Sequence, residues 1–476
     1  MSLKIYNTLT RKKEEFIPIK KGEAKMYVCG ITPYDECHLG HARAAVVFDV
    51  VFRYLKYLGY DVTYIRNFTD VDDKIIRKAN DTGVSCQEIS EKYIQSYTEQ
   101  MTRLGVQLPT CEPKATEHIL EMIAHIQKLI DRGMAYVVGT DVFYEVRKFT
   151  LYGKLSQKKI DELESGSRIE VDEKKRDPLD FALWKGAKPG EPEWDSPWGQ
   201  GRPGWHIECS AMSSKYLGDQ FDIHGGGRDL SFPHHENEIA QSEGATGKDP
   251  FARYWMHNGF VNIDSTKMSK SLGNFLSVQK ILEDWDPEVV RFFLLSANYG
   301  SPIDYTPDAM RNAQDALLRY YEALSRFEKT PTGSDSLPVF SLNKILEETL
   351  SDDFNTTQVI GKVFEYIREL NRFLDTGKQP SSTSSAEFKT SLEKITSVLG
   401  LFGQNPGAFL SAQKKKSLQT SPISEEEIQK LIIERRDARK SKNFKRSDEI
   451  RDQLATQGIV LKDNPDGTTG WEVKKS

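Results

Sequence analysis

The stretch that decides the fold is "KMYVCGITPYDECHLGHARAAVVFDVVFRYLKYLGYDVTYIRNFTD", residues 25–70. Residues 25–30 form a short apolar run that ends in glycine, which is typical of a β-strand. Residues 41–60 repeat apolar side chains at helical spacing, and residues 61–70 have a second strand pattern. Strand, helix and strand in this order predict a βαβ unit, and hence a parallel sheet that binds ligands at the carboxyl ends of its strands.

The remaining chain predicts a sheet domain split by an insertion and followed by helices. The sheet pattern pauses at a charged, strand-rich segment containing "DVFYEV" and resumes with "FDIHGGG" and "RYWMHNGFV". From Asp286 onward the apolar residues repeat at helical spacing. We therefore expect an α/β Rossmann-like parallel-sheet catalytic domain with an insert, an α-helical bundle and a small α/β C-terminal module. The expected boundaries are residues 1–133 and 193–300 for the two halves of the catalytic domain, 134–192 for the connective insert, 301–410 for the bundle, 411–424 for a linker and 425–476 for the C-terminal module.

Composition is that of a folded globular protein. Hydrophobic residues make up 38% and charged residues 28% of the 476 residues, which is enough for packed cores. The sequence has no run of about eighteen apolar residues and no signal-peptide pattern, so we expect a cytoplasmic protein without a membrane span. The net charge of −5 argues against indiscriminate binding of polyanions. Residues 411–460 nevertheless carry twelve Lys and Arg against eight Asp and Glu, which fits either a nucleic-acid contact or a solvated helix surface.

The five cysteines are odd in number and scattered, so a disulfide framework is not expected. Thiol or metal chemistry is the favoured use of some of them. For Cys37, Cys86 and Cys111 we expect a structural role as small buried side chains.

The first motif is "HLGH" at the start of the predicted helix. A helix N-terminus offers free N–H groups and a positive dipole to phosphate, and Gly40 lets a flat base approach the backbone. The imidazoles of His38 and His41 can donate to phosphoryl oxygens as charge develops. A pair of surface histidines at a helix cap is the plainer alternative, but the place of the motif at the end of the first strand favours a phosphate site.

The second motif is "STKMSKSLGN", residues 265–274, which follows a predicted strand. Lys267 and Lys270 stand among small residues in this loop. Such lysines can close on a triphosphate when the reaction begins and so favour the transition state, whereas most lysine-rich loops are only solvated.

H-x-G-H in the first half of the sheet and K-M-S-K-S in the second half together resemble the class I aminoacyl-tRNA synthetases. Leu39 stands where isoleucine is usual in that family, a change that conserves volume. The resemblance implies activation of an amino acid by ATP to an aminoacyl-adenylate and its transfer to the terminal ribose of a tRNA. It also implies catalytic roles for His38, His41, Lys267 and Lys270, ATP contacts from Gly40, His38, His41 and Lys270, and Mg²⁺ accompanying ATP.

Four further side chains suggest a metal. Cys29 ends the first strand, Cys209 follows the insert, and His234 and Glu238 stand four residues apart, hence on one face of a helix. Cys, Cys, His and Glu make a suitable tetrahedral zinc set, although the spacing lacks the paired C-x-x-C of a structural zinc ribbon. His235 is an alternative to His234 as the ligand.

The whole constellation resembles the cysteinyl-tRNA synthetases, and the likeness extends over nearly the entire chain. The segments that carry it are "YVCGITPYDECHLGHAR", "RNFTDVDDKI", "GRPGWHIECSAM", "FDIHGGGRDLSFPHHENEIAQSE" and "KMSKSLGN". The resemblance implies one Zn²⁺ per chain, with L-cysteine, ATP and tRNA(Cys) as partners and a monomeric protein. It assigns zinc to Cys29, Cys209, His234 and Glu238, and substrate contacts to Thr69, Trp205, His224, Gly226 and Asp229. Residues 425–476 resemble the family's anticodon-binding domain, in which Arg439, Asp448 and Asp463 would stand where contacts to base edges are expected. Trp471 would either stack on a base or pack the hairpin.

Two other functions compete with this interpretation. A cysteine ligase that acts on a small amine, as in mycothiol biosynthesis, would keep the zinc site and both ATP motifs but would not use an anticodon module. An RNA-binding protein with a structural zinc would need neither the lysine loop nor H-x-G-H. The basic segment beyond Lys414 argues against the first alternative, and the two motifs argue against the second.

Overall fold

The computed structural model describes residues 2–159, 173–263, 266–267, 275–338, 342–419, 422–463 and 469–473. Residues 1–315, 338–366 and 383–402 form one compact unit, and residues 316–337, 367–382 and 403–476 form a second. Over the described part of the chain, no helix has the length and apolar character needed to span a lipid bilayer.

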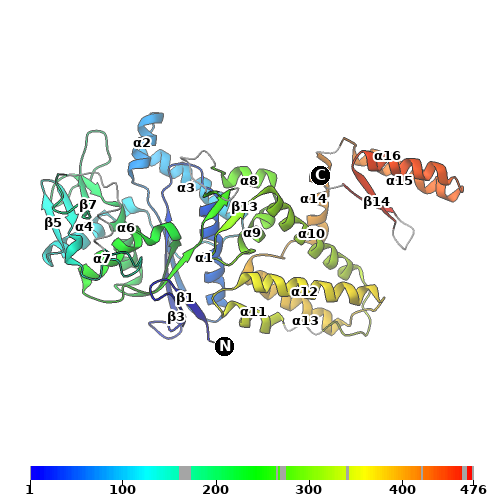
Figure 1. The fold of residues 1–476 in the computed structure, drawn as a ribbon, viewed down its shortest axis with the longest axis horizontal. Coiled ribbons are helices and arrows are strands. Elements are labelled where there is room, and N and C mark those ends of the chain that lie inside the picture. Colours follow the sequence, from blue (N-terminus) through cyan, green and yellow to red (C-terminus); the bar gives the residue numbers. More distant parts are fainter. Residues whose placement is uncertain are drawn as a thin grey trace. The chain divides into compact units, whose positions relative to one another are not determined.

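The first unit is built on a sheet of four parallel strands in the order β10-β9-β3-β4 (Figure 1). α1 (Leu39–Tyr57) connects β3 to β4, so the predicted βαβ unit is confirmed. This helix is buried on almost every side because the sheet covers one face and α9 (Pro287–Leu295) contacts another. Since the four strands are parallel, their carboxyl ends lie at one edge of the sheet. The strands are β3 (Glu23–Ile31), β4 (Asp61–Phe68), β9 (Phe221–Gly227) and β10 (Ala252–Asn258).

The insert forms its own antiparallel sheet in the order β5-β6-β7-β8. Its strands are β5 (Ala135–Val138), β6 (Asp141–Tyr144), β7 (Phe181–Gly186) and β8 (Gly201–Pro203). The fourth strand lies beyond residue 192, where the sequence placed the end of the insert. Three residues are too few for an alternating pattern to be visible, and only the antiparallel pairing with β7 identifies β8 as a strand.

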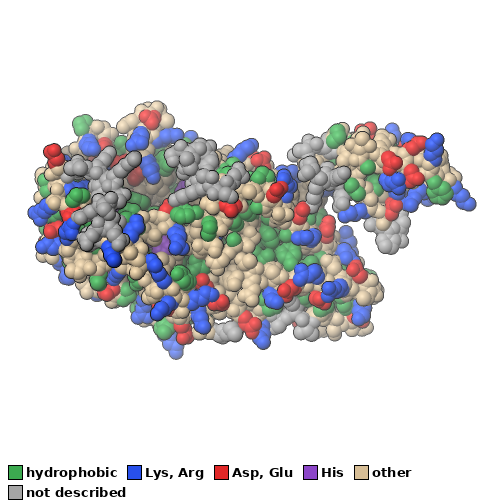
Figure 2. All heavy atoms as spheres, in the orientation of Figure 1, with side chains coloured by type: hydrophobic (Ala, Val, Ile, Leu, Met, Phe, Trp, Pro, Cys, Tyr) green, Lys and Arg blue, Asp and Glu red, His purple; other side chains and the backbone are tan. Residues whose placement is uncertain are grey.

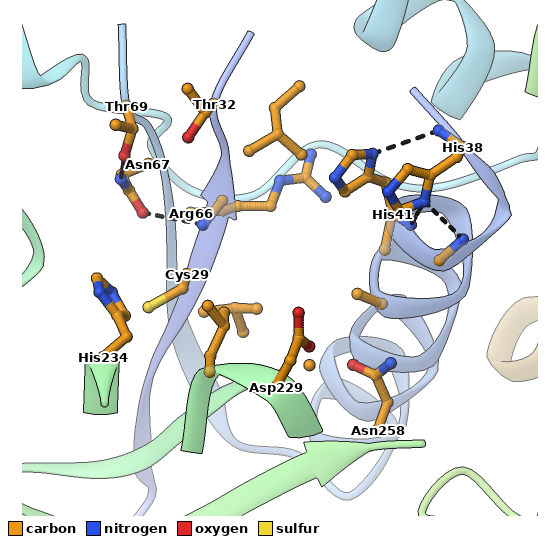
Figure 3. A pocket seen from close by; sticks show the side chains of 18 of the residues that line it. Cys29, Thr32, His38, His41, Arg66, Asn67, Thr69, Asp229, His234 and Asn258 are labelled. Carbon is orange, nitrogen blue, oxygen red and sulfur yellow. Dashed lines mark hydrogen bonds between the residues drawn. The ribbon is translucent and has the colours of Figure 1, made fainter. Parts of the chain in front are cut away.

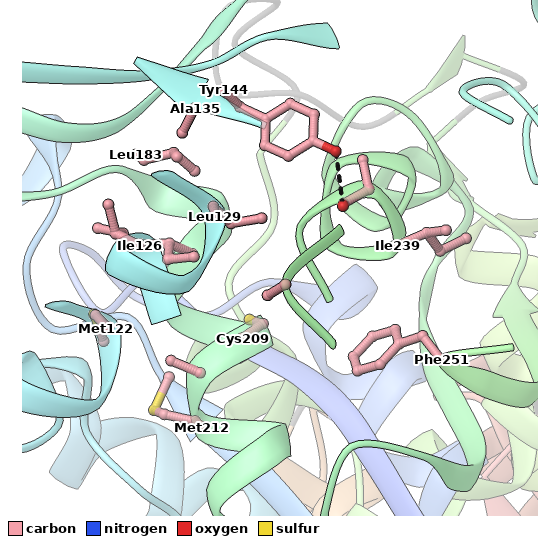
Figure 4. Packing of buried hydrophobic residues seen from close by; sticks show 14 of the residues in the cluster. Met122, Ile126, Leu129, Ala135, Tyr144, Leu183, Cys209, Met212, Ile239 and Phe251 are labelled. Atoms are coloured by element: carbon pink, nitrogen blue, oxygen red, sulfur yellow. Dashed lines mark hydrogen bonds between the residues drawn. The ribbon is translucent and has the colours of Figure 1, made fainter. Parts of the chain in front are cut away.

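A buried core joins the insert to the helices beside the main sheet (Figure 4). α4 (Ile119–Asp131) contributes Ile126 and Leu129, and α6 (Trp205–Leu217) contributes Met212. Tyr144 of the insert donates its hydroxyl proton to the carbonyl oxygen of Ala240 on α7 (His234–Thr246), at 2.8 Å. α6 and α7, which carry three of the four predicted metal ligands, are therefore held in a packed interior.

Several smaller elements complete the first unit. A three-stranded sheet, β12-β11-β13, contains the first residues of the second motif, because β12 consists of Thr266 and Lys267. The other elements are β1 (Lys4–Asn7), β2 (Lys12–Glu15), α2 (Asp73–Thr82), α3 (Cys86–Arg103), η1 (Ala115–Glu117), η2 (Val146–Lys148), η3 (Arg228–Ser231), β11 (Val261–Ile263), α8 (Val278–Asp284) and β13 (Ile303–Tyr305).

The described residues between 307 and 419 form helices, as the apolar spacing predicted. These helices are α10 (Pro307–Lys329), α11 (Leu342–Leu350), α12 (Thr356–Asp375), α13 (Ser382–Leu399) and α14 (Pro406–Gln419). α14 extends through residues 411–419, where the sequence predicted a linker. The reason is that Ala, Gln, Lys and Leu in this segment are good helix formers, and Pro406 stands at the first helical position, where proline is favoured.

The C-terminal module has the predicted helix pair and hairpin. α15 (Glu425–Lys440) and α16 (Phe444–Thr456) pack against each other, and β14 (Ile459–Asp463) pairs antiparallel with β15 (Thr469–Val473). Trp471 is only 8% exposed and belongs to a small core that includes Ile428 and Leu454. The ring is therefore a core side chain, so of the two expectations for Trp471 the structure favours packing of the hairpin over stacking on a base.

Candidate active site and metal centre

A cavity of about 530 Å³ opens at the carboxyl edge of the main sheet (Figure 3). Its wall comes from the ends of all four strands and from the first turns of α1 and α6. The position is the one that the βαβ pattern predicted for a ligand. The predicted site residues that line it are Cys29, His38, Gly40, His41, Thr69, Trp205, Cys209, Asp229 and His234.

Three of the predicted metal ligands, Cys29, Cys209 and His234, line one end of this cavity, and the buried Glu238 adjoins them without lining it. Their candidate ligand atoms lie within 4.8 Å of one another. The Sγ atoms of Cys29 and Cys209 are 3.7 Å apart, and Oε1 of Glu238 is 3.4 Å from Cys29 Sγ and 3.0 Å from His234 Nε2. Two sulfurs, one imidazole nitrogen and one carboxylate oxygen form a donor set that could hold a four-coordinate metal ion.

The electrostatics of this group prepare it for a cation. Burial raises the pKa of the Cys29 thiol well above its usual value, with Cys209 adding to the effect. Burial also opposes ionisation of Cys209, but the hydrogen bond from Cys29 and the charge of His234 lower the pKa of its thiol to about 6. Burial likewise acts against the Glu238 carboxylate, and the imidazoles of His224 and His234 overcome it and hold the pKa well below the usual range. A thiolate and a carboxylate are thus available near neutral pH.

His234 is oriented by neighbours on α6. Trp205 stacks on its ring with centroids 4.3 Å apart, and Nδ1 of His206 lies 2.9 Å from Nδ1 of His234. A metal-binding imidazole commonly has its second nitrogen held in this way. His206 was not singled out in the sequence, although "GWHIECSAM" places it one helical turn from the cysteine on α6.

A second donor set overlaps the first. It consists of Cys29, His224, His235 and Glu238, so Cys29 and Glu238 are shared. His224 and His235 do not line the cavity: the His224 Nε2 donates to Glu238 Oε2 at 2.8 Å, and the His235 Nδ1 lies 2.8 Å from His257 Nε2. These two imidazoles stand one layer behind the wall, where His224 supports Glu238.

Gly226 is also absent from the cavity wall, whereas Gly227 lines it. A Cβ atom at Gly226 would come within 2.9 Å of the His235 ring, so this glycine makes room for the second layer of imidazoles. Its predicted substrate contact, like that of His224, would be indirect in this arrangement.

The two histidines of the first motif cap α1. His38 is the N-cap, and its Nδ1 accepts from the backbone N–H groups of Gly40 and His41 at 3.1 and 3.4 Å. The His41 Nδ1 accepts from the backbone N–H of His38 at 3.3 Å, and the rings stack 3.7 Å apart. Because Nδ1 is the acceptor in both rings, the neutral rings carry their proton on Nε2.

Thr69 is placed by a residue that the sequence did not single out, Asn67 at the end of β4. The Asn67 Nδ2 donates to Thr69 Oγ1 at 3.4 Å, and its Oδ1 accepts from the backbone N–H of Gly30 at 3.0 Å. Asn67 therefore links the strand that carries Cys29 to a residue predicted to contact substrate. Its position at the carboxyl end of a predicted parallel strand was the available signal.

The second motif is only partly within the described residues. Lys267 ends β12, where its backbone pairs with Asn262 of β11. Lys270 lies outside the described residues.

In the C-terminal module, the remaining predicted contacts lie on the surface. Asp463 accepts from Arg435 at 2.7 and 2.9 Å and from Arg439 at 2.9 Å, while Asp448 pairs with Arg451 at 3.1 Å. Acidic and basic side chains are mixed over the visible face of α15 and α16 (Figure 2).

Phe444, the first residue of α16, is 61% exposed beside Lys445. The sequence reasoning missed Phe444, although an aromatic residue within a basic run was a signal for it.

Comparisons with known proteins agree with this geometry. The family described as "tRNA synthetases class I (C) catalytic domain" matches residues 15–315, the "DALR domain" matches 346–403, and the "Cysteinyl-tRNA ligase anticodon binding domain" matches 422–469. Two relatives named cysteine–tRNA ligase, from Geobacter metallireducens and Geobacter sulfurreducens, are 55% and 54% identical to this chain over all of both sequences.

A solved structure supports the fold at low sequence identity. The methionyl-tRNA synthetase of Mycobacterium tuberculosis in complex with methionyl-adenylate is 15% identical, with a TM-score of 0.57 over 82% of this chain and 94% of that one. Its likeness bears on the fold alone. Taken with the full-length relatives and the matched catalytic domain, it leads to one conclusion: this chain belongs to the cysteine–tRNA ligase family of class I aminoacyl-tRNA synthetases.

Proposed function

We propose that this protein is a cysteine–tRNA ligase, which activates L-cysteine with ATP to cysteinyl-adenylate and transfers the cysteinyl group to the 3′ end of tRNA(Cys). The observation that carries the proposal is the convergence of Cys29, Cys209, His234 and Glu238, the first three of which line one end of the cavity. The capped N-terminus of α1 lines the same cavity. The cavity thus combines side chains that can bind a metal with a helix N-terminus that can bind phosphate. This combination suits an enzyme that selects its amino acid with a metal and binds a nucleotide beside it.

Zn²⁺ is the metal proposed for these four residues, because thiolate and imidazole ligands suit it better than Mg²⁺. Bound there, zinc would supply a position that accepts the thiolate of cysteine, whereas a serine hydroxyl stays protonated and binds poorly. A site built for one specific bond can reject the analogue that lacks it by several orders of magnitude, so no editing domain is required. The set with His234 is favoured over the overlapping set, since Cys29, Cys209 and His234 line the cavity and His224 and His235 do not.

Other residues of the cavity would bind and orient the two substrates. The Nε2 protons of His38 and His41 would donate to phosphate oxygens of ATP, which Mg²⁺ accompanies, as charge moves onto the leaving pyrophosphate. Lys270, with Lys267, would neutralise the same charge. Thr69 and Trp205 would border the cysteine, and Asp229 would contact the adenosine.

The C-terminal module is proposed to bind the anticodon. Arg439, Asp448 and Asp463 are exposed enough to meet base edges, where guanidinium and carboxylate groups can read guanine and cytosine. Phe444, rather than Trp471, offers a ring on which a base could stack. We expect the protein to act as a monomer in the cytoplasm, where it would meet its tRNA.

A cysteine ligase acting on a small amine is the second candidate. It would need the same cavity but not the match of residues 422–469 to an anticodon-binding domain, which disfavours it.

The test is cysteine-dependent exchange of labelled pyrophosphate into ATP, followed by charging of a tRNA(Cys) transcript. We expect exchange with cysteine and none with serine, full charging of the transcript, and one zinc per chain by mass spectrometry. No exchange with any amino acid would reject the proposal. Exchange without charging would replace it with the small-amine ligase.

A further inference from the structure

Asn258, the last residue of β10, carries a buried hydrogen-bond acceptor that the fold does not use. The residue is 4% exposed, and its Nδ2 donates to the carbonyl oxygen of Gly259 at 3.2 Å. Its Oδ1 has no hydrogen-bond partner among the residues described. The Nδ2 bond fixes the orientation of the amide, because rotating it would set two oxygens against each other. A buried acceptor without a donor is uncommon and points to a missing partner.

That acceptor faces the cavity. Asn258 is one of the lining residues, at the carboxyl end of a parallel strand. Figure 3 shows its amide beside Asp229, on the side of the cavity where α1 lies, whereas Cys29 and His234 stand on the opposite side. The missing hydrogen-bond donor therefore belongs to a ligand bound near α1. It does not belong to a group bound at Cys29 and His234.

The backbone around Asn258 is locked in place. The Gly259 N–H donates to Tyr299 O at 2.8 Å, and a Cβ atom at Gly259 would be 2.3 Å from Ser301 O. The guanidinium of Arg43 is fully buried in α1 and donates to the carbonyl oxygens of Phe260, at 2.8 Å, and Ser301. Because both neighbouring segments are fixed, the Asn258 acceptor is preorganised.

A second acceptor lies at the next strand end. Asn258 pairs in register with Gly227 of β9, and a Cβ atom on Gly227 would be 2.5 Å from Oδ1 of Asp229. The Asp229 carboxylate thus lies over the residue that pairs with Asn258. Two adjacent acceptors suit two adjacent donors, and in ATP the 2′ and 3′ hydroxyls of ribose form such a pair. The adenine amino group offers donors at a single position only.

We propose that Asn258 Oδ1 accepts a hydrogen bond from a ribose hydroxyl of ATP, next to the Asp229 carboxylate, and so makes the enzyme selective for ribonucleotides. This inference rests on the proposed function, since it assigns a residue to the binding of its nucleotide. The selectivity follows because a deoxy analogue would leave a buried acceptor without a donor.

The experiment is a cycle of variants and substrate analogues in cysteine-dependent pyrophosphate exchange. ATP, 2′-dATP and 3′-dATP are compared as substrates of the zinc-loaded full-length protein and of its Asn258→Ala variant. In the unmodified protein we expect kcat/KM to fall about 10- to 100-fold for one of the two deoxy analogues. In Asn258→Ala, we expect kcat/KM for ATP to fall by a similar factor relative to the unmodified protein. The kcat/KM for the affected deoxy analogue should fall less than about threefold, because that analogue lacks the hydroxyl that would bind Asn258.

Two further variants separate a lost contact from a damaged fold. Asn7→Ala is the matched control: Asn7 is a buried asparagine outside the cavity, and its Oδ1 accepts from Trp255 N of β10 at 3.0 Å. This variant should be less stable but fully discriminating. Should Asn258→Ala not fold, Asn258→Leu removes the acceptor at nearly constant volume and gives the same comparison.

Unchanged discrimination in Asn258→Ala would overturn the inference, and so would equal losses with ATP and with both deoxy analogues. Purine riboside triphosphate, which lacks the amino group, gives the other contradicting outcome: if Asn258→Ala abolishes discrimination against that analogue instead, the acceptor reads the base. Absence of exchange in the unmodified protein would reject the proposed function, whereas normal exchange with unchanged discrimination would reject only the role of Asn258.

Discussion

Around the predicted metal ligands of the first unit the ionisable side chains of α7 are buried and hydrogen-bonded within the protein, whereas most of those in the C-terminal module lie on the surface in ion pairs. Glu236 and Glu238 of α7 have no exposed surface, while the side chains of Asp463 and Asp448 are 41% and 60% exposed. Removing one partner from a buried group leaves the other unsatisfied, and water takes over the same role at the surface. Substitutions of these buried groups should therefore be costly, and those in the module should act mainly on the binding of the partner.

The largest effect is expected for Cys209→Ser. The substitution replaces a thiol that ionises readily with a hydroxyl that does not, so the metal should be lost and cysteine-dependent exchange should fall by more than about 100-fold. Metal content and exchange rates are the measurements. Cys86→Ser serves as the control, because Cys86 lies outside both donor sets and should keep metal and activity. Retained metal in Cys209→Ser would show that the ligand set is wrong.

A smaller effect, on stability, is expected for Glu236→Gln. The Glu236 carboxylate accepts from the backbone N–H groups of Gly153 and Ser156 at 2.9 and 2.8 Å, which ties the insert to α7. An amide cannot accept as strongly and points a donor at a donor, so the free energy of unfolding should fall by about 1–3 kcal/mol. Urea unfolding followed by tryptophan fluorescence measures it, since six of the seven tryptophans lie in the first unit.

The surface counterpart in the same unit is Glu283→Gln. Glu283 pairs with Lys280 at 2.9 Å, and the two side chains are 55% and 59% exposed. This change should cost less than about 1 kcal/mol. Equal costs for the two substitutions would remove the distinction between buried and exposed carboxylates.

Phe444→Ala should weaken tRNA binding without affecting the cavity. Loss of one base stack is worth about 1–3 kcal/mol, hence roughly a tenfold or greater rise in the KM for tRNA. The KM values for ATP and cysteine in exchange should not change, and neither should the melting temperature. Ile433→Ala is the matched control, an exposed apolar side chain of the same module that should leave the KM for tRNA unchanged. An unaltered KM in Phe444→Ala would exclude the ring from the interface.

The smallest effect is a pH dependence of the module. The hydrogen bond from Arg435, with further help from Thr469, holds the pKa of the Asp463 carboxyl below its ordinary value of 3.8. A depressed pKa means that the ionised form stabilises the fold above about pH 4, and that this contribution is lost as the pH falls further. Hydrogen exchange of the α15 and β14 amides should therefore show local opening below pH 4. Asp463→Asn should open to a similar extent at neutral pH and lose this dependence.

Much of the fold was predictable because its signals are local. The apolar spacing of α1 and the short apolar runs of β3 and β4 predicted the βαβ unit, and helical spacing predicted α10 and α12. The misses have equally physical causes. β8 was missed because only its pairing with β7 makes it a strand. A linker was predicted at residues 411–419 of α14 because polar and basic residues occur both in helices and in linkers.

The candidate site was predicted less evenly. Residues within a motif, such as His38 and His41, can be recognised from the sequence itself. The roles of Asn67, His206 and Asn258 depend on the residues that surround them in the fold. Trp471 and Phe444 show the same limit. Composition cannot tell a stacking ring from a core ring, and the pairing of Leu461 with Trp471 decides that Trp471 lies in the small core.

The sequence by itself determined which atoms can bind a metal and that the N-terminus of α1 can bind phosphate. The reason is that the chemistry of thiols, imidazoles and glycine does not depend on the fold. Tertiary structure alone decided that Cys29 and Cys209, 180 residues apart, bring their sulfurs to 3.7 Å. It also decided that Asn258 has an acceptor to spare beside Asp229. The physical reason is that a parallel sheet gathers the ends of distant strands at one edge, and separation along a chain carries no information about that distance.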